Sequence, residues 1–295
     1  MGQVQPMAVE TARQPQAVLA SSVPIRRVGW IRRHDWPRPI LIAMTALAFV
    51  IMYAPLVIIA ILSFSKNVIA AFPLNGFTFG WYHEFFTDPQ AWQAISTTAI
   101  IAAGALVLST LIGLPVALMA HRYNFRGKAT IRQVIYMPVV LPGLLNGFVL
   151  LNYLILLHFP LGIYAVVIVH GTVLAAVMFS MVYARLARLD PSLEEAAMDL
   201  GAQPRQVFRY VTMPILRVSL VGAWLLILML SLDDLLAAYF LLGQGFNIQM
   251  LIWSRLRVQL SPELEAMATV IFAFSVLIVI LYSLVADRER QLGIG

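Results

Sequence analysis

Two adjacent aspartates, Asp233 and Asp234, stand in an otherwise apolar stretch and are the residues best suited to chemistry. They follow Arg217 by 16 and 17 residues, which is about 24 Å along a helix. An ionised carboxylate in hydrocarbon costs at least about 2.5–3.5 kcal/mol, so two neighbouring ones need a compensating environment. The pattern favours a cation-attracting site in a water-filled path. Two alternatives stay open: a span that ends early and leaves both solvated, or a structural pair with a partner's arginine.

Three further polar residues lie near apolar stretches. Glu263 and Glu265 would extend an acidic path at the outer rim. They fit an ordinary helix N-terminus equally well, because acids are favourable in the first turn. His170 lies in the middle of the apolar run Val-Ile-Val-His-Gly-Thr. We expect it to be a hydrogen-bonded packing residue, with a place on the path as the alternative.

Prolines and glycines interrupt another apolar stretch. Pro138 and Pro142 are followed by Gly143 and Gly147, which form a GxxxG pattern. This pattern permits close approach of two helices, and we favour that interpretation. The alternative is a hinge or an unwound segment that lines the path.

The segment 190–213 is long for a connection between membrane helices, where about 2–8 residues are usual, and it has strong local signals. Asp190 is placed to cap a helix, Pro191 to occupy its first position, and Gly201 to end it. A second short helix is expected over 204–210. An ordered loop with apolar faces usually has a docking partner.

Charged residues of this loop have predicted roles as well. Glu194 and Glu195 lie in the first turn of the first short helix, where acids favour the helix dipole. Arg205 or Arg209 is expected to pair with one of these glutamates. Pro214 then begins the next span.

No catalytic constellation is evident. The chain has no cysteine, its five histidines are scattered, and no HExxH motif or nucleophile elbow occurs. Gly127-Lys128 lacks the upstream glycine and the following Ser or Thr of a phosphate-binding loop. We therefore expect no enzyme activity, no metal site and no bound cofactor in this chain.

Uncharged windows locate the elements that must position these residues. A spanning helix needs about 20 apolar residues. The 52 uncharged residues 133–184 are about twice too long for one span and are broken at 158–162. The expected spans are 39–64, 93–120, 133–157, 162–184, 214–242 and 265–286. This gives an all-α transmembrane domain over 39–286, with tails at 1–38, expected to be disordered, and 287–295.

The basic residues set the orientation. Of the 20 Lys and Arg residues, 17 lie in the tails and in the loops on one side of the six expected spans. Cytoplasmic loops carry the excess of positive charge, so both termini are predicted to be cytoplasmic in a bacterial inner membrane. The net charge of +6 is thereby a topology signal and does not indicate nucleic-acid binding.

Overall composition agrees with this assignment. Hydrophobic residues make up 61% of the 295 residues, charged residues only 12%, and the mean hydropathy is +0.84. A soluble domain has about a quarter of its residues charged. The composition therefore excludes an ordinary soluble enzyme and a disordered chain, and it predicts membrane lipid as the surroundings.

The loop residues resemble a known motif. Glu195-Ala196-Ala197, three residues, Gly201, nine residues and Val211-Thr212-Met213-Pro214 resemble the EAA loop of binding-protein-dependent ABC importer permeases. The family pattern ends in Ile-x-Leu-Pro, so Val and Met are departures that keep the apolar character. The resemblance implies the six-helix type I importer fold. It also implies that 190–213 is the coupling loop, contacting an ATPase through Glu195–Gly201.

A second resemblance concerns the cargo. Ser231-Leu232-Asp233-Asp234-Leu235 and the run Pro262–Thr269 are similar to segments of spermidine/putrescine permeases. The resemblance implies polyamine transport with a second permease subunit, as a heterodimer more than a homodimer. It also implies two ATPase subunits that bind ATP and Mg, and an extracytoplasmic solute-binding protein. Other cargoes of related permeases are the alternatives: amino-alkylphosphonates, opines, other amines or ferric ion. An ATP-independent channel or an intramembrane enzyme is a remote one.

Overall fold

The computed structural model describes residues 2, 38–258 and 261–291, so the expected tail 1–38 lies almost wholly outside the described residues. Within them the chain is helical, with one isolated antiparallel bridge between Ser65 and Phe77. The chain divides into two compact units, residues 1–52 and 53–295. The all-α prediction is confirmed for the described part.

The elements in chain order are α1 (Arg38–Leu62), α2 (Gly80–Thr87), α3 (Pro89–Arg122), α4 (Lys128–Val140), α5 (Gly143–Leu156), α6 (Ile163–Leu186), α7 (Pro191–Asp199), α8 (Pro204–Val207), the π-helix η1 (Phe208–Thr212), α9 (Met213–Leu232), α10 (Leu236–Leu241), α11 (Ile248–Leu256) and α12 (Pro262–Gln291). Helix α1 begins in the first unit, and the second unit starts at Tyr53. All residues of functional interest lie in the second unit.

Five helical segments are long and apolar enough to cross a membrane: α1, α3, α6, Pro204–Leu232 and Pro262–Ile280. The sixth expected span, 133–157, is a bent pair, because α4 and α5 meet at 106°. Pro142 has no amide hydrogen and disfavours the helical conformation of Leu141 before it, whose backbone is extended at φ −74° and ψ 138°. The third expected span is therefore a broken helix.

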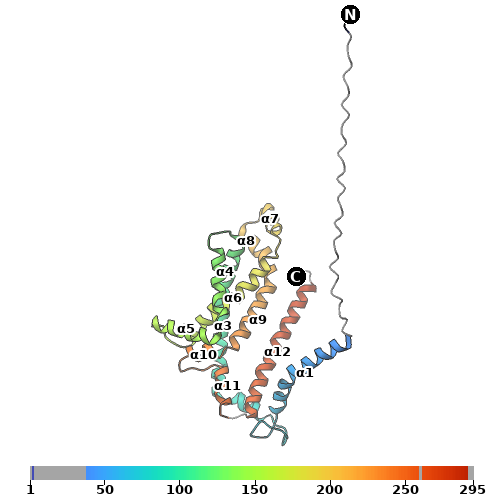
Figure 1. Cartoon of the computed structure of the whole chain (residues 1–295), viewed down its shortest axis with the longest axis vertical. Helices are drawn as coiled ribbons and strands as arrows, with labels where there is room; N and C mark the ends of the chain where they lie inside the picture. Colours follow the sequence, from blue (N-terminus) through green and yellow to red (C-terminus); the bar gives the residue numbers. More distant parts are fainter. Residues whose placement is uncertain (1, 3–37, 259–260, 292–295) are drawn as a thin grey trace. The chain divides into compact units, whose positions relative to one another are not determined.

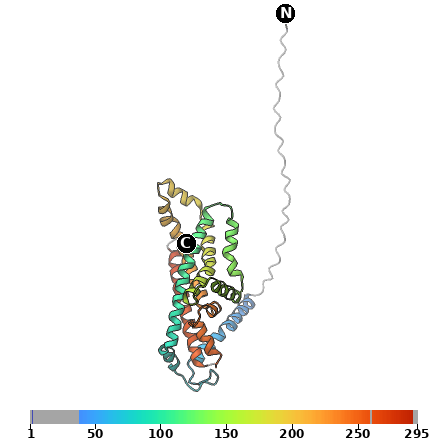
Figure 2. The ribbon, with the colours of Figure 1, turned by 90° about the vertical axis from the view of Figure 1, so that its left-hand side faces the viewer.

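The core of the second unit is the packing of α3, α6 and α9, which run alongside one another (Figures 1 and 2). Glycine makes the closest approach possible. A Cβ on Gly113 of α3 would lie 2.6 Å from the carbonyl oxygen of Ala175 on α6. In lipid the hydrophobic effect does not drive helices together, so such close packing supplies the attraction.

The fifth span is shorter than the sequence predicts. Helix α9 ends at Leu232 and α10 starts at Leu236, whereas one continuous helix to Leu242 was expected. Two side chains satisfy carbonyl groups at this break: Gln249 Nε2 donates to Leu232 O, and Asn247 Nδ2 donates to Asp234 O, both at 3.2 Å. Irregular backbone at membrane depth is tolerated when its polar groups are satisfied in this way.

The two ends of the second unit carry different elements. Figure 1 shows α7 beyond one end of the α3–α6–α9 packing and α11 at the other end. Helix α12 continues to Gln291, past residue 286 where the last span was expected to end. The break between α9 and α10 lies between these two ends.

Candidate functional site

The acidic break, residues 233–235 between α9 and α10, brings the predicted aspartates to two helix ends. Asp233 is the C-cap of α9, with φ −89° and ψ −4°. Asp234 Oδ1 accepts a hydrogen bond from the Ala237 amide at 2.9 Å, and therefore caps the first turn of α10. The span expected over 214–242 is interrupted at the two aspartates, as one alternative from the sequence allowed, and the two carboxylates have different surroundings.

His170 joins α6 to the acidic break. The ring is 3% exposed, and its Nδ1 lies 3.0 Å from Ser231 Oγ. Its Nε2 lies 3.1 Å from Asp234 Oδ2, which is an ion-pair distance, although the two atoms are not aligned as a hydrogen bond. The sequence predicted either packing or a path role for His170, and the contact with Asp234 was missed because 64 residues separate the two positions.

Ser231, His170 and Asp234 form a serine–histidine–aspartate chain of contacts. Such a chain can activate a serine for nucleophilic attack when the hydroxyl meets a substrate carbonyl. Ser231 is 2% exposed, so its hydroxyl faces protein and not a substrate site. The arrangement orients side chains and does not form a hydrolytic site.

The side chain of Asp233 differs from that of Asp234 in its surroundings. Its side chain is exposed, whereas that of Asp234 is 35% exposed. Within residues 38–258 and 261–291, no hydrogen bond or ion pair of the Asp233 carboxylate is found. The acidic break therefore presents one engaged carboxylate and one that is available to a ligand.

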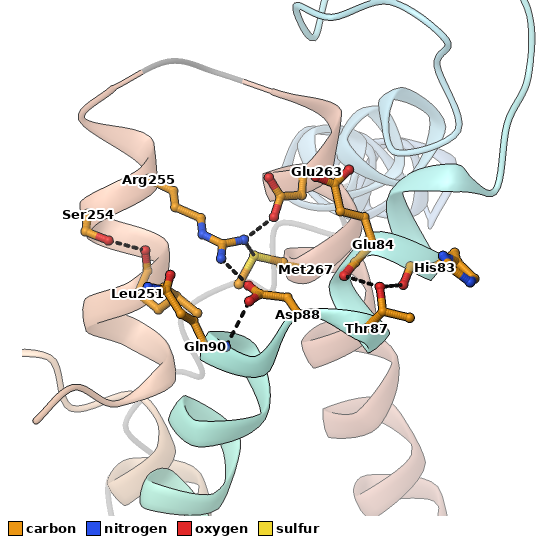
Figure 3. A network of polar contacts seen from close by, with 10 residues as sticks. All are labelled: His83, Glu84, Thr87, Asp88, Gln90, Leu251, Ser254, Arg255, Glu263 and Met267. Atoms are coloured by element: carbon orange, nitrogen blue, oxygen red, sulfur yellow. Dashed lines mark hydrogen bonds and ion pairs between the residues drawn. The ribbon is translucent and has the colours of Figure 1, made fainter.

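A second acidic cluster lies where α3 and α12 begin and α11 ends, and Figure 3 shows it closely. The guanidinium of Arg255 donates to Asp88 and to Glu263, and the three residues form what we call the arginine clamp. Their side chains are 22%, 17% and 19% exposed. A hollow of about 330 Å³ adjoins the clamp, lined also by Glu84 and Thr87.

The clamp changes the interpretation of the outer glutamates. Glu263 pairs with an arginine of the same chain, so its carboxylate is already compensated. Glu265 is half-buried, and in the described part of the chain no partner of its carboxylate is found. No hydrogen bond or ion pair among the described residues joins either glutamate to the acidic break.

Burial tends to raise the pKa of Asp88, but its surroundings act in the opposite direction. The hydrogen bond and positive charge of Arg255, together with the Gln90 amide at 2.8 Å, outweigh that tendency and lower the pKa of Asp88 below its ordinary value. Asp88 also caps α3.

The prolines of the broken third span lie at its bend. The carbonyl of Pro138, within α4, accepts from Asn146 Nδ2 at 2.6 Å, and Pro142 is the N-cap of α5. Gly147 packs against α10, since a Cβ there would lie 2.9 Å from Phe240 Cδ2. The expected close packing through glycine and the expected break therefore occur together, and α5 supports the element that follows the aspartates.

The predicted coupling loop has the expected local structure. Asp190 caps α7 by accepting from the Ser192 amide at 3.0 Å, Pro191 occupies the first turn, and Gly201 adopts φ +86° after the helix. Only glycine adopts that region without strain. No residue of α7 is buried; Leu200, just beyond it, is 90% exposed. Residues 195–201 thus present an uncovered surface.

The expected pairing of Glu194 or Glu195 with Arg205 or Arg209 is wrong. Glu194 Oε1 accepts from Arg122 at the end of α3, at 2.7 Å, and from the Thr212 hydroxyl on η1. Arg209 instead stacks over Tyr210. The partners were missed because Arg122 lies 72 residues away, and no local spacing indicates such a contact.

The contacts of Glu194 favour its ionised form. Partial burial acts to raise its pKa, but the hydrogen bonds from Thr212 and Arg122 and the charge of Arg122 outweigh it, so the pKa lies below the ordinary value. Glu194 thereby fastens α7 to both α3 and the start of α9. Pro214, in the first turn of α9, continues this connection.

Comparison with known sequences agrees with this geometry. Residues 109–290 match the family described as binding-protein-dependent transport system inner membrane component. The putrescine transport system permease protein PotI of Escherichia coli is 33% identical, over 85% of this chain and 92% of the relative. The spermidine/putrescine transport system permease protein PotC of Escherichia coli is 31% identical, over 85% and 94%.

Solved structures show the same fold. A chain of the bacterial alginate ABC transporter in complex with an alginate pentasaccharide-bound periplasmic protein has a TM-score of 0.65 at 18% identity, covering 88% of this chain and 95% of that one. A chain of an amino acid ABC transporter with histidines has a TM-score of 0.52 at 19% identity, covering 72% and 99%.

The matched family and the apolar helices agree on the class of protein. The chain is a multi-pass transport subunit of an inner membrane and not an enzyme. Its work depends on a binding protein and an ATPase, as is general for this kind of permease. This chain belongs to the family of binding-protein-dependent transport system inner membrane components.

Proposed function

We propose that this chain forms the translocation path of an importer for polyamines, the flexible polycations typified by putrescine and spermidine. The observation that carries the proposal is the acidic break, where Asp233 and Asp234 adjoin in an apolar span without an arginine or lysine partner among the described residues. Permeases named for putrescine and for spermidine/putrescine, 33% and 31% identical, support it. A cargo with several amines suits neighbouring carboxylates.

The energies are of a suitable size for transport. An ionised carboxylate in a span costs about 2.5–3.5 kcal/mol on insertion scales. A charge-assisted hydrogen bond from an ammonium contributes about 1.5–3 kcal/mol. The two terms nearly offset, so a passing amine is favoured at the break without being trapped there.

The orientation follows from the charge distribution. Both termini and α7 lie on the cytoplasmic side, where 17 of the 20 Lys and Arg residues cluster. The arginine clamp then lies on the outer side, because Figure 1 places α11 at the end opposite α7. Cargo enters from the clamp side and leaves from the α7 side.

The partners follow from what this chain lacks and what it exposes. Without a phosphate-binding loop, it relies on two ATPase subunits that bind ATP and Mg. Residues 195–201 dock on one of them. A second, related permease completes the path as a heterodimer, and an extracytoplasmic solute-binding protein delivers the cargo.

Alternating access links these parts. When the ATPases close, they displace α7, and Glu194 transmits the displacement through Arg122 to α3 and through Thr212 to η1 and α9. Because α9 ends at Asp233, the same motion shifts the acidic break. The bend between α4 and α5 and the contact of Gly147 with α10 give that region a place to move.

Uptake by proteoliposomes tests the cargo. The complete complex, with loaded binding protein outside and ATP inside, is assayed with labelled putrescine, spermidine and 2-aminoethylphosphonate. We expect ATP-dependent uptake of a polyamine and loss of that uptake in the double variant Asp233→Asn, Asp234→Asn. Glu84→Gln, which removes an exposed acid outside both the clamp pairs and the break, is the matched control.

A further relative is the reason for including 2-aminoethylphosphonate in the uptake assay. A putative 2-aminoethylphosphonate permease protein PhnV of Salmonella paratyphi A is 28% identical over 70% of this chain. That cargo carries a negatively charged phosphonate beside its amine, so an acidic break favours it less than a polyamine. Uptake of the phosphonate with no uptake of either polyamine would overturn the proposal.

A further inference from the structure

The two aspartates of the acidic break differ in how their oxygens are engaged. Asp234 Oδ1 accepts from the Ala237 amide at 2.9 Å, and Oδ2 faces His170 Nε2 at 3.1 Å. Its backbone carbonyl accepts from Asn247, which is 2% exposed. Asp233 has only its backbone amide engaged, with Met229 O at 3.1 Å. One aspartate is fixed on three sides, and its neighbour is fixed by the main chain alone.

Burial and a contact with Ser231 hold the ring of His170 in place independently of Asp234. Its ring is 3% exposed and Nδ1 contacts Ser231 Oγ at 3.0 Å, so α6 and the end of α9 hold it from two sides. Nε2 is buried, lacks an aligned hydrogen bond within the described residues, and points to the break. A buried polar atom in this state is costly, and Asp234 is the group that compensates it.

We propose that His170 and Asp234 are positioning residues, which set the angle between α9 and α10, and that Asp233 alone contacts the ammonium of the cargo. This inference rests on the proposed function. Asp234 caps α10 while Asp233 caps α9, so the direction of the Asp233 side chain depends on how the two helices are joined. The acid pair is therefore not two equivalent ligands.

The transport test measures cargo moved per ATP hydrolysed, because that ratio does not depend on how much complex assembles. Asp233→Asn is expected to lower the ratio at least about tenfold, the loss of one charge-assisted hydrogen bond, with an unchanged melting temperature. His170→Leu is expected to lower the ratio several-fold and the melting temperature by about 3 °C. His170→Gln, which keeps a donor near the Nε2 position, is expected to restore both.

Combined variants show whether His170 acts through Asp233. His170→Leu added to Asp233→Asn should lower the ratio no further than Asp233→Asn alone. In melting temperature, His170→Leu and Asp234→Asn should be non-additive, since they break the same contact. His170→Leu and Asp233→Asn should be additive in melting temperature, since these side chains share no contact.

Several results would overturn the inference. Asp234→Asn that keeps the wild-type melting temperature and lowers the ratio as much as Asp233→Asn would make Asp234 a direct ligand. His170→Leu with a wild-type ratio, or His170→Gln as damaged as His170→Leu, would remove the positioning role. Failure of the proposed function is separate: the wild-type complex then moves no polyamine, while the non-additivity in melting temperature remains.

Discussion

The acidic break and the arginine clamp place similar side chains in opposite electrostatic situations. In the clamp, Asp88 and Glu263 share the guanidinium of Arg255, a cation that never loses its charge. In the break, Asp234 meets only the imidazole of His170, and Asp233 meets no cation within the described chain. The carboxylates of the clamp are compensated within the chain, whereas the carboxylate of Asp233 has no compensating cation among the described residues.

This difference distinguishes the two clusters by whether their carboxylates are compensated by a fixed cation. Both clusters lie at helix ends and both contain two carboxylates, so neither residue type nor position on a helix distinguishes them. The presence of a fixed cation does, because a compensated carboxylate has little to gain from a passing amine. The clamp ties α3, α11 and α12 together, whereas the break leaves the charge of Asp233 uncompensated within the described chain.

The largest expected effect contrasts one carboxylate from each cluster. Asp233→Asn should reduce polyamine uptake by about 10–100-fold, which corresponds to a charge-assisted hydrogen bond of about 1.5–3 kcal/mol. Glu263→Gln should leave uptake per assembled complex within about twofold, since Glu263 is already paired. Both are measured as initial uptake rates in proteoliposomes with equal amounts of complex.

The same two variants can also show that the acidic break and the arginine clamp do not differ in function. If Glu263→Gln lowers uptake as much as Asp233→Asn at equal thermal stability, the clamp contacts cargo. Glu265→Gln belongs in the same series. Its carboxylate is half-buried without a partner in the described part of the chain, so a loss of uptake in that variant would extend the acidic path to the outer rim.

Removing the shared cation is the next test. Arg255→Gln should destabilise the protein by about 2 kcal/mol, less than the 3–5 kcal/mol of a fully buried pair because the side chains are partly exposed. A thermal unfolding curve in detergent measures this as a shift of several degrees. Adding Glu263→Gln to Arg255→Gln should restore about half of the loss, because one uncompensated carboxylate disappears.

The stability of the Arg255→Gln, Glu263→Gln double variant shows whether the clamp stabilises the protein through charge or through packing. If the double variant is less stable than Arg255→Gln alone, the clamp stabilises through the shape and contacts of its side chains more than through charge. Arg257→Gln is a suitable control, since Arg257 lies two residues away and stacks on Trp253, outside the clamp. It should shift the unfolding temperature little.

Local features of the fold were predictable because their causes are local. Asp190, Pro191 and Gly201 each act on adjacent backbone groups, and α7 begins and ends where they indicate. The apolar windows predicted the spanning helices for the same reason. The bend at Pro142 was visible in the sequence as a proline, although its angle of 106° was not.

The contacts that define the sites were not predictable in this way. Arg255 reaches Asp88 across 167 residues and Arg122 reaches Glu194 across 72, and no spacing rule covers such distances. The end of α9 at Leu232 agrees with the alternative of a span that ends early, since Asp233 and Asp234, which follow it, have low helix propensity. The break depends on Asn247 and Gln249 satisfying its carbonyls, which only the tertiary structure brings there.

A smaller effect concerns the paired glutamate of the loop. Arg122→Gln removes the charged anchor of Glu194, whose pair is partly exposed, so the stability loss should stay below about 1 kcal/mol. Cargo moved per ATP hydrolysed should fall about two- to fivefold, because α7 is then fastened to α3 less firmly. Arg126→Gln is the matched control, because Arg126 is exposed and lies four residues beyond Arg122, between α3 and α4.

The outcome bears on how coupling passes along the chain. If Arg122→Gln leaves the cargo moved per ATP hydrolysed unchanged, the contact of Glu194 with Thr212 is sufficient to couple α7 to α9. The variant Thr212→Val then becomes decisive, because it removes the hydroxyl that donates to Glu194 with little change of shape. If neither variant changes the ratio, the displacement of α7 reaches α9 through the main chain of α8 and η1.

The smallest expected effect concerns pH: the stability contributed by the charge of Asp88 should not change between pH 7 and 5. The pKa of Asp88 lies below its ordinary value of 3.8, so its charge stabilises the fold at any pH above that value. This contribution is lost only as the pH falls through the lowered pKa of the folded protein. Asp88→Asn keeps the helix cap and removes the charge. The difference in melting temperature between wild type and Asp88→Asn should therefore be constant from pH 7 to 5, whereas a difference that shrinks in this interval would mean that Arg255 does not hold Asp88 ionised.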